Sequence, residues 1–337
     1  MTRHPNAAPP ESVVIVRLSA LGDTVHIMPL VASLRQAWPD TRIDWIVQPT
    51  TRALMAPHPD VDEFLVFDRS AGLRAFARLR RHLASRRWDL AIVPHTAIKA
   101  GLVTAMIRAP RKLGYDRARA PELNWLFTTE SIAPRSPQHM QDEFIEFLDH
   151  LGVEPRMEWN FAFSEQERAA QREWFDRLDR PVLAVALHTS RPGKNWIAER
   201  YARVLEAAEG DFGFRTMIVG GVTPGEEALA AEVIERTRAR PIDARADDVR
   251  RLAWLLDRSD LVLSPDTAPL HIAVALGTPT VGLYATTDPG RVGPYGRYRD
   301  LTVDRFGSDG SMNTIEVSDV MEKLHAAVDT YLSGPAE

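Results

Sequence analysis

The chain has 337 residues, of which 45% are hydrophobic and 26% charged, so it is globular in composition and long enough for two domains of ordinary size. It contains no cysteine, which excludes disulfides and thiolate–metal sites and suits a reducing compartment. Its formal net charge of −5 argues against general nucleic-acid binding.

The sequence predicts neither a signal peptide nor a membrane span. Residues 1–12 are polar and rich in proline, and the apolar run Val13–Val16 is interrupted at Arg17. No stretch approaches the roughly 18 consecutive apolar residues that a membrane-spanning helix needs. We therefore expect a cytoplasmic protein.

Short apolar runs alternate with helical patterns along the first half of the chain. The predicted strands are Val13–Leu18, Ile43–Val47, Phe64–Phe67, Leu90–Val93 and Lys112–Gly114. The predicted helices between them include Thr24–Ala37, Leu73–Ser85 and Ala97–Ile107.

A second series of the same kind begins after a charged helical segment at Ser164–Leu178. Its predicted strands are Val182–Leu187, Arg215–Val219, Asp260–Leu263 and Thr280–Leu283. Its predicted helices lie near Ile197–Ala208, Gly225–Arg236, Val249–Leu256 and Pro269–Leu276, and a last helix covers Val317–Leu332.

This alternation predicts an α/β protein with two parallel sheets, each covered by helices on both faces. We place a Rossmann-like domain at residues 1–165 and a second at 166–315. We expect the segment 316–337 to form a helix that packs back on the first domain. Ligands in such folds bind at the carboxyl ends of the strands, so the cleft between the domains is the predicted site.

The most informative motif is Ser264-Pro265-Asp266-Thr267-Ala268-Pro269-Leu270-His271, which joins a predicted strand to a predicted helix. Asp266 and Thr267 are favourable N-cap residues. A helix that starts at the end of a strand directs free N–H groups and the positive end of its dipole at any bound anion. The motif predicts a phosphate or diphosphate site, although a plain capped strand–helix joint would have the same residues.

Asp23 follows the first predicted strand in the sequence Ser19-Ala20-Leu21-Gly22-Asp23-Thr24. Its place at the start of a helix suits two roles, an N-cap or a carboxylate base. The segment lacks both the Gly-x-Gly-x-x-Gly spacing of dinucleotide sites and the Gly-Lys-Ser/Thr ending of a P-loop.

Two further loops follow predicted strands of the second half. The first, His188–Trp196, contains the hydroxyls of Thr189 and Ser190 and the cations of Arg191 and Lys194, a combination that suits a diphosphate. The second contains Gly220-Gly221, which allow close approach of backbone to a ligand or simply form a turn. The first loop could also be an ordinary surface loop.

The segment from Arg69 to Arg87 holds seven arginines and no acidic residue. Arg74, Arg78 and Arg81 recur at helical spacing beside an apolar face, which predicts a basic amphipathic helix. Its arginine face is either simply solvated or contacts an anionic group, such as an acidic acceptor or phospholipid headgroups.

Asp60-Val61-Asp62 spells an Asp-x-Asp string of the kind that binds divalent metals in some sugar-transfer enzymes. It leads directly into a predicted strand of the first half, so we interpret its aspartates as turn residues and predict no metal site.

Taken together, these segments resemble the heptosyltransferases of glycosyltransferase family 9, which build the inner core of lipopolysaccharide. The matching segments are Arg17–Asp23 with His26 and Pro29, His188–Trp196, Gly220-Gly221, Ser264–His271 and Thr287–Arg291 leading to Gly293–Gly296. They follow the family's order over nearly the whole chain.

The resemblance implies a GT-B fold, with the two parallel sheets facing a central cleft, and an inverting, metal-independent transfer of heptose from ADP-heptose. It implies that Asp23 is the general base and that Lys194 neutralises charge on the departing ADP. The implied donor-binding residues are Thr189, Ser190, Lys194, Gly220, Gly221, Asp266, Thr267, Ala268 and His271. No cofactor or metal is implied beyond the ADP-sugar itself.

The resemblance also implies an anionic glycolipid acceptor of the Kdo–lipid A type, reached at the cytoplasmic face of the inner membrane, and no nucleic-acid partner. Our candidates for holding its sugar acid are Arg74, Arg78, Lys99 and Arg117.

The chain departs from the family pattern in two places. Ala268 replaces a usual glycine, and Pro94–Gly101 keeps Lys99 but lacks the acid and the glycine of that segment. Three alternatives therefore stay open. The same transfer could use another acceptor, such as a protein or small metabolite, or another nucleotide sugar. The chain could be a nucleotide-sugar epimerase or hydrolase of the same fold, or a non-catalytic nucleotide-binding protein.

Overall fold

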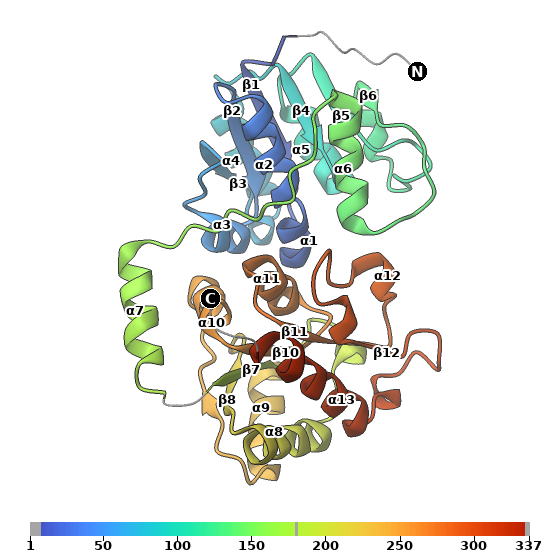
Figure 1. The fold of residues 1–337 in the computed structure, drawn as a ribbon. Coiled ribbons are helices and arrows are strands. Elements are labelled where there is room, and N and C mark those ends of the chain that lie inside the picture. Colours follow the sequence, from blue (N-terminus) through green and yellow to red (C-terminus); the bar gives the residue numbers. More distant parts are fainter. Residues whose placement is uncertain (1–7, 179–180, 334–337) are drawn as a thin grey trace. The chain divides into compact units, whose positions relative to one another are not determined.

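The computed structural model describes residues 8–178 and 181–333, and the chain divides into two compact units, 1–162 and 163–337 (Figure 1). Residues 1–7 and 334–337, which fall within our predicted outer segments, lie outside the described residues. Each unit is an α/β layer structure with its own core, and each is described separately below.

The first unit is built on a six-stranded sheet with the order β3-β2-β1-β4-β5-β6, in which all neighbouring strands are parallel. Its central strands are continuous apolar runs because both faces of the sheet are covered. The strands are β1 (Ser12–Val16), β2 (Arg42–Val47), β3 (Glu63–Val66), β4 (Leu90–Val93), β5 (Arg111–Gly114) and β6 (Glu130–Ser131).

Alternate residues of β1 define the two helix layers of this unit. Val13 and Ile15 point into a core shared with α2 and α6, whereas Val14 and Val16 point into a core shared with α4 and α5. The helices are α1 (Leu21–His26), α2 (Met28–Ala37), α3 (Pro49–Met55), α4 (Leu73–Leu83), α5 (Ile98–Met106) and α6 (Met140–Leu151), with 3₁₀ turns η1 (Arg69–Ala71) and η2 (Asn124–Phe127).

The second unit repeats this topology. Its sheet has the order β12-β11-β10-β7-β8-β9. Numbered from the start of its own unit and read from the β9 edge, this is the same 3-2-1-4-5-6 order as in the first sheet. All of its pairs are parallel. The strands are β7 (Val182–Ala186), β8 (Arg215–Val219), β9 (Ile242–Asp243), β10 (Leu261–Pro265), β11 (Thr280–Tyr284) and β12 (Thr302–Asp304).

Helices also cover this second sheet, with α8, α9 and α13 sharing one apolar core with it. The helices are α7 (Glu165–Phe175), α8 (Ala198–Phe212), α9 (Pro224–Arg236), α10 (Val249–Arg258), α11 (Ala268–Leu276), α12 (Pro289–Val292) and α13 (Val317–Ala327), with 3₁₀ turns η3 (Pro192–Lys194), η4 (Arg299–Leu301) and η5 (Met312–Thr314) and a π-helical turn η6 (Val328–Leu332).

The last helix differs from our expectation that it packs back on the first domain. Val320, Leu324 and Ala327 of α13 are fully buried, and they lie in the core of the second unit with α8 and β11. Because this apolar face is used inside the second core, α13 is an integral part of that unit.

Two helical predictions for the first unit also need correction. The predicted helix Thr24–Ala37 is two helices that meet at Ile27, since Pro29 has no N–H with which to continue the hydrogen bonding of α1 into α2. We did not predict α6, although Phe144 and Phe147 have the spacing of a buried helix face and Gly152 ends it in the left-handed conformation.

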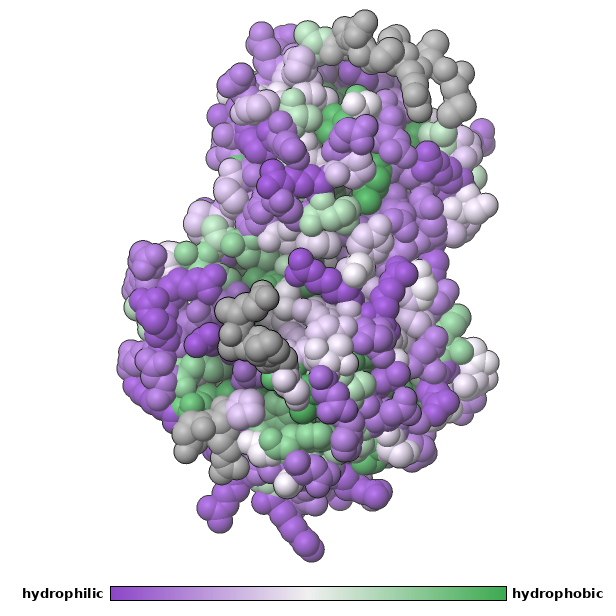
Figure 2. Space-filling model, viewed as in Figure 1, coloured by the Kyte–Doolittle hydropathy of each residue, from purple (hydrophilic) through white to green (hydrophobic). Residues whose placement is uncertain are grey.

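Hydrophilic side chains cover most of the visible surface of each unit, and apolar side chains are scattered in small patches (Figure 2). Within residues 8–178 and 181–333, no helix combines the length and the apolar character needed to cross a membrane.

Candidate functional site

The order of the strands locates a candidate site in each unit. In a doubly wound sheet, ligands bind beyond the carboxyl ends of the strands, where the chain switches from one side of the sheet to the other. That point lies between β1 and β4 in the first unit and between β7 and β10 in the second. Asp23 and His95 follow the first pair of strands, and Lys194 and Asp266 follow the second.

Asp23 lies in the first turn of α1, where its carboxylate pairs with Arg17 and accepts a hydrogen bond from the N–H of Ala20 at 2.9 Å. Burial alone would raise the pKa of Asp23, but the Arg17 guanidinium and the Ala20 N–H hold that pKa below its ordinary value. The carboxylate is therefore ionised at neutral pH, and its side chain is still 27% exposed.

Arg17 is fixed by its surroundings at the end of β1. One guanidinium nitrogen donates to the carbonyl of Pro94 at 2.6 Å, and the group lies over the ring of Phe144 at 5.2 Å. Because Arg17 is only 10% exposed in its side chain, the pair holds the Asp23 carboxylate in one position.

His95 completes this cluster from the end of β4. Its Nδ1 accepts a hydrogen bond from the N–H of Leu18 at 3.3 Å, so the ring proton lies on Nε2. Burial and the nearby Arg17 lower the pKa of His95 to about 3, so the imidazole is neutral at physiological pH. The loop that carries it is held by Asn124, which donates to the carbonyls of His95 and Ala97.

Asp266 is the centre of the second cluster. One carboxylate oxygen accepts from Lys194 Nζ at 2.5 Å and from the Thr287 hydroxyl at 2.7 Å, while the other lies 3.2 Å from His271 Nε2. Burial would raise the pKa of Asp266, but His271 and Lys194 hold it well below the usual range of an aspartate. The cluster joins the loops that follow β7, β10 and β11.

The loop that carries Lys194 is built from its own polar side chains. The Thr189 hydroxyl donates to the carbonyl of Arg191 at 2.7 Å and accepts from the Arg191 N–H at 3.2 Å. Thr189 is only 3% exposed, so its hydroxyl shapes the loop, whereas Ser190 is exposed. The Asn195 side chain accepts from the Thr189 N–H at 2.7 Å and closes the turn.

Gly220 and Gly221 follow β8 in a turn that requires glycine. Gly220 has a φ of +135°, and a Cβ on Gly221 would come within 2.7 Å of the Glu226 carboxylate. The Gly221 N–H already donates to Glu226 at 2.8 Å. This turn is therefore explained by its own hydrogen bonds with the start of α9.

The predicted strand–helix joint at Ser264–His271 is present, with β10 ending at Pro265 and α11 beginning at Ala268. Thr267 is the N-cap residue, but neither its side chain nor that of Asp266 caps the helix within the described residues. The first N–H groups of α11 thus lie beside the Asp266 cluster.

The four acceptor candidates occupy separate positions in the first unit. Arg74 and Arg78 lie one turn apart on the exposed face of α4, and Lys99 lies in the first turn of α5. Arg117 lies over the ring of Trp125, 4.6 Å from its centroid. Among the described residues no hydrogen bond or ion pair links the four side chains.

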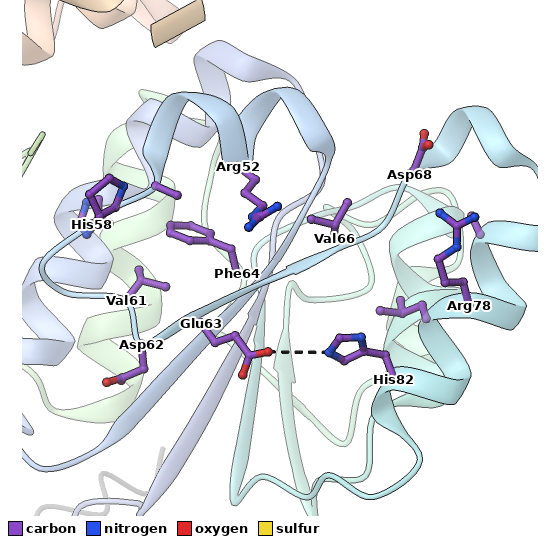
Figure 3. A pocket seen from close by; sticks show the side chains of 14 residues that line it. Arg52, His58, Val61, Asp62, Glu63, Phe64, Val66, Asp68, Arg78 and His82 are labelled. Carbon is purple, nitrogen blue, oxygen red and sulfur yellow. Dashed lines mark ion pairs between the residues drawn. The ribbon is translucent and has the colours of Figure 1, made fainter. Parts of the chain in front are cut away.

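A cavity of about 610 Å³ lies between α3, β3 and α4 (Figure 3). Phe64 and Leu79 are among its apolar lining residues, and Arg52 and Arg78 provide guanidinium groups. It is separate from both clusters described above.

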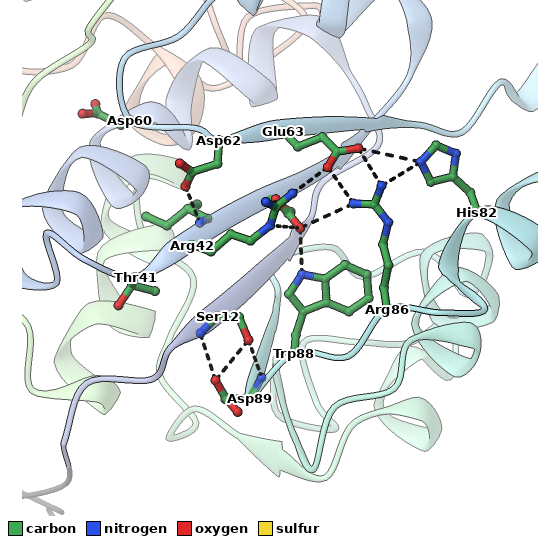
Figure 4. Close-up of polar contacts among 12 residues, drawn as sticks. Ser12, Thr41, Arg42, Asp60, Asp62, Glu63, His82, Arg86, Trp88 and Asp89 are labelled. Carbon is green, nitrogen blue, oxygen red and sulfur yellow. Dashed lines mark hydrogen bonds and ion pairs between the residues drawn. The ribbon is translucent and has the colours of Figure 1, made fainter.

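The Asp60 and Asp62 carboxylates are used structurally. Asp62 accepts from the Ile43 N–H at 2.7 Å and from Arg35 at 2.6 Å, and Asp60 accepts from the Asn160 amide at 2.7 Å. Nearby, Glu63 binds both Arg42 and Arg86, and Trp88 donates to the buried Asp44 (Figure 4). Among the arginines of the segment Arg69–Arg87, Arg86 is thus the one whose guanidinium forms an ion pair within the described residues.

Three residues of these clusters carried no assigned role in our sequence analysis, namely Arg17, His95 and Thr287. In the structure Arg17, His95 and Thr287 follow the carboxyl ends of β1, β4 and β11, although our predicted strand Val13–Leu18 had included Arg17. A search for polar side chains at every such strand end would have found them.

Two doubly wound parallel-sheet units in one chain define the GT-B class of two-domain α/β proteins. Solved structures of this class superpose on nearly the whole chain. A glycosyltransferase family 9 protein from Veillonella parvula has a TM-score of 0.83 at 23% identity and covers 94% of this chain and 97% of that one. The Escherichia coli heptosyltransferase WaaC with ADP-2-deoxy-2-fluoro heptose has a TM-score of 0.75 at 23% identity and covers 94% and 99%.

The chain belongs to glycosyltransferase family 9 (heptosyltransferase), whose sequence model matches residues 76–316. It is 31% identical over 316 residues to the lipopolysaccharide core heptosyltransferase OpsX of Haemophilus influenzae, with 90% of this chain and 89% of that protein covered. The protein is therefore a glycosyltransferase, which confirms the family and the GT-B fold that the motifs implied.

Proposed function

We propose that the protein transfers heptose from ADP-heptose to a lipopolysaccharide inner-core acceptor of the Kdo–lipid A type, with inversion at the anomeric carbon and without a metal ion. The observation that carries this proposal is the Asp266 cluster, in which Lys194, His271 and the start of α11 converge at the switch point of the second sheet. The names of the relatives, a lipopolysaccharide core heptosyltransferase and a heptosyltransferase with an ADP-heptose analogue, support this donor and this acceptor class.

In the proposed reaction, an acceptor hydroxyl oxygen attacks the anomeric carbon of the donor while the bond from that carbon to the ADP oxygen breaks. Asp23 takes the hydroxyl proton. Its lowered pKa keeps it ionised and makes it a weak base, so the proton moves late, when the new C–O bond has made the hydroxyl acidic. Arg17 and the Ala20 N–H orient the carboxylate for this transfer.

The departing ADP gains negative charge, which Lys194 and the N-terminus of α11 are suited to stabilise. The Lys194 ammonium has three donors and gives one to Asp266, so two are left for phosphate oxygens. We assign donor binding to Ser190, Asp266, Thr267, Ala268 and His271 with it. We assign Thr189, Gly220 and Gly221 to the backbone that shapes the same site.

For the acceptor we propose Arg74, Arg78, Lys99 and Arg117 as the cations that hold its sugar acid, because all four are exposed. Since such an acceptor is a glycolipid, the protein would act at the cytoplasmic face of the inner membrane.

The decisive experiment measures ADP release from ADP-L-glycero-D-manno-heptose with and without Kdo–lipid A, together with the mass of the product. We expect release that depends on the acceptor and a mass gain of one heptose. Release without acceptor would instead indicate an epimerase or hydrolase. ADP binding without transfer would indicate another acceptor or a non-catalytic protein, and would direct attention to the altered segment 94–101.

Changing Asp23 to Asn tests the proposed base. We expect kcat to fall by about 10²–10⁴-fold, as for loss of a general base, while the affinity for ADP and the folded state are kept. The matched control is Asp40→Asn, which makes the same change at an exposed carboxylate and should leave kcat unchanged. Near-normal turnover by the Asp23 variant would exclude this assignment.

The proposal also predicts that transfer continues in excess EDTA. Lys194, His271 and the helix N-terminus provide positive charge for the diphosphate, and Asp62 is already paired with Arg35. A strict requirement for added Mg²⁺ would contradict this part of the proposal.

A further inference from the structure

The exposed face of α4 carries an unusual set of side chains. Six arginines on and beside this helix are exposed, and their guanidinium groups form no hydrogen bond or ion pair with any other described residue. The charge of one of them, Arg78, acts on the Asp68 carboxylate and lowers its pKa. The other five are called the free arginines: Arg69, Arg74, Arg80, Arg81 and Arg87. Elsewhere in the chain most arginines are engaged, as Arg86 is with Glu63. The free positive charge of the first unit is therefore concentrated on this face, in a protein whose net charge is −5.

An apolar side chain projects from the same face. Leu73, the first residue of α4, is 87% exposed, which is the highest value among the large apolar residues described. The opposite face of α4 is well packed, with Ala75, Leu79 and Leu83 almost fully buried against the sheet. Leu73 is therefore not needed for the packing of the helix.

The neighbouring helix α5 extends this surface. Both helices pack on the same face of the sheet, since Ala75 of α4 and Ala100 of α5 lie in one core. The outward residues of α5 include the exposed Lys99 and Leu102, the latter 43% exposed. Each of these two adjacent helices thus has at least one exposed cation and one exposed leucine.

The acidic groups at the edge of this surface are already occupied. Asp68 accepts from the N–H and hydroxyl of Ser70, and Glu122 accepts from the N–H of Ile98 at the start of α5. Among the described residues neither carboxylate forms an ion pair with one of the five free arginines, so an external anion would not have to displace one.

We infer that the α4–α5 face, defined by Leu73, Leu102, Lys99 and the five free arginines, docks on a bilayer that contains anionic phospholipid. Guanidinium groups bind phosphate headgroups, and exposed leucines can insert among the acyl chains. A nucleic acid or other soluble polyanion would use the arginines but gain nothing from Leu73. The inference does not depend on the identity of the donor or acceptor sugars.

The test is co-sedimentation of the full chain with vesicles of phosphatidylcholine alone or with about 30% phosphatidylglycerol. We expect binding to the anionic vesicles that weakens as salt is raised. The double variant Arg80→Glu/Arg81→Glu should reduce this binding at least about 25-fold, since each juxtamembrane cation contributes roughly fivefold. Neither residue belongs to the proposed catalytic or acceptor site, so ADP release with a water-soluble acceptor should be unchanged.

Two further variants make the result specific. Arg203→Glu/Arg240→Glu changes the net charge equally at exposed positions of the second unit and should bind vesicles like the wild type. Leu73→Ser should also weaken vesicle binding, which a purely ionic partner would not explain. Equal binding by the Arg80/Arg81 variant, no effect of Leu73→Ser, or no binding of the wild type to anionic vesicles would each overturn the inference.

Discussion

The Asp266 carboxylate shows how one residue can organise a cationic site. It binds Lys194, Thr287 and His271 at once, although these side chains come from three separate parts of the second unit: the loop after β7, the loop after β11 and helix α11. Its lowered pKa means that it stays charged and keeps Lys194 in place over the whole physiological range. In our proposal the lysine is thereby positioned before the diphosphate of the donor arrives, which would lower the cost of reorganisation during the reaction.

Replacing Lys194 by Met should therefore impair chemistry more than folding. Loss of one preorganised cation at a leaving group typically lowers the rate by about 10²–10³-fold, and we expect a kcat loss of this size. Steady-state kinetics would measure kcat, and calorimetric titration would measure the affinity for ADP. Lys323→Met, a change at a partly exposed lysine of α13, is the control and should leave both quantities unchanged. A normal kcat in the Lys194 variant would remove this residue from the mechanism.

At the scale of elements, the ends of helices are fixed by side chains that also tie separate elements together. Ser164 and Glu167 form a capping box at the start of α7, and Glu167 also receives two hydrogen bonds from Arg250 of α10, at 2.6 and 2.8 Å. The hydrogen bonds from Arg250 are the main reason that the pKa of Glu167 falls to about 2.

This lowered pKa predicts how stability depends on pH. A carboxylate whose pKa is lower in the folded than in the unfolded state stabilises the fold above its ordinary pKa, and the contribution is lost as the pH falls towards about 2. Glu167→Gln should therefore lower the free energy of unfolding by about 1–2 kcal/mol near neutral pH, a value discounted for solvent screening, and by much less near pH 3.

Chemical unfolding of both proteins at several pH values would check this. Glu165→Gln, in the same turn of α7, should show neither effect, because the Glu165 side chain is exposed and forms no hydrogen bond or ion pair with another residue that the structure describes. If the free energies of unfolding of wild type and Glu167→Gln differ by the same amount at every pH, the charge of Glu167 is not the cause of that difference.

We expect the substitution of glycine by alanine to change the free energy of unfolding in opposite directions at two positions. In Gly101→Ala the new Cβ would lie 2.5 Å from the Phe127 ring, where α5 packs on η2, so we expect a loss of about 1–2 kcal/mol in the free energy of unfolding. In Gly210→Ala, within α8, no atom lies within 4 Å of the new Cβ, and better helix propensity should add about 0.5–1 kcal/mol. Thermal or chemical unfolding would show whether the two shifts have opposite signs.

For the whole molecule, the main feature is the use of one topology twice. Both sheets have the same strand order, and in both the charged clusters follow the two central strands. The Arg17–Asp23 cluster lies in the first unit and the Lys194–Asp266 cluster in the second. In our proposal the base and the leaving-group site therefore belong to different units of the chain.

This division predicts a localised response to ADP. In hydrogen-exchange measurements we expect the largest gain in protection in residues 188–196 and 264–271 of the second unit, because these segments carry the proposed donor residues. The start of α1, with Asp23, should gain less from ADP alone. Stronger protection in the first unit than in the second would contradict our assignment of the donor site.

The sequence by itself determined the α/β class and most of the strands. The apolar runs at β1, β4, β7 and β10 are recognisable because a parallel strand covered on both faces is apolar throughout. The joint at Ser264–His271 was equally clear, since a strand, a turn and a helix start follow one another locally. The ordered motifs also identified the glycosyltransferase family, which the comparisons confirmed.

Only the tertiary structure decided which of these residues meet. Lys194 and Asp266 are 72 positions apart, and so are not linked by any local pattern, yet their side chains are 2.5 Å apart. His95 reaches Leu18 across 77 positions for the same reason: β1 and β4 are neighbours in the sheet. Our prediction that the last helix packs on the first domain failed for a related reason: an apolar helix face shows that a helix is buried but does not specify the core in which it is buried.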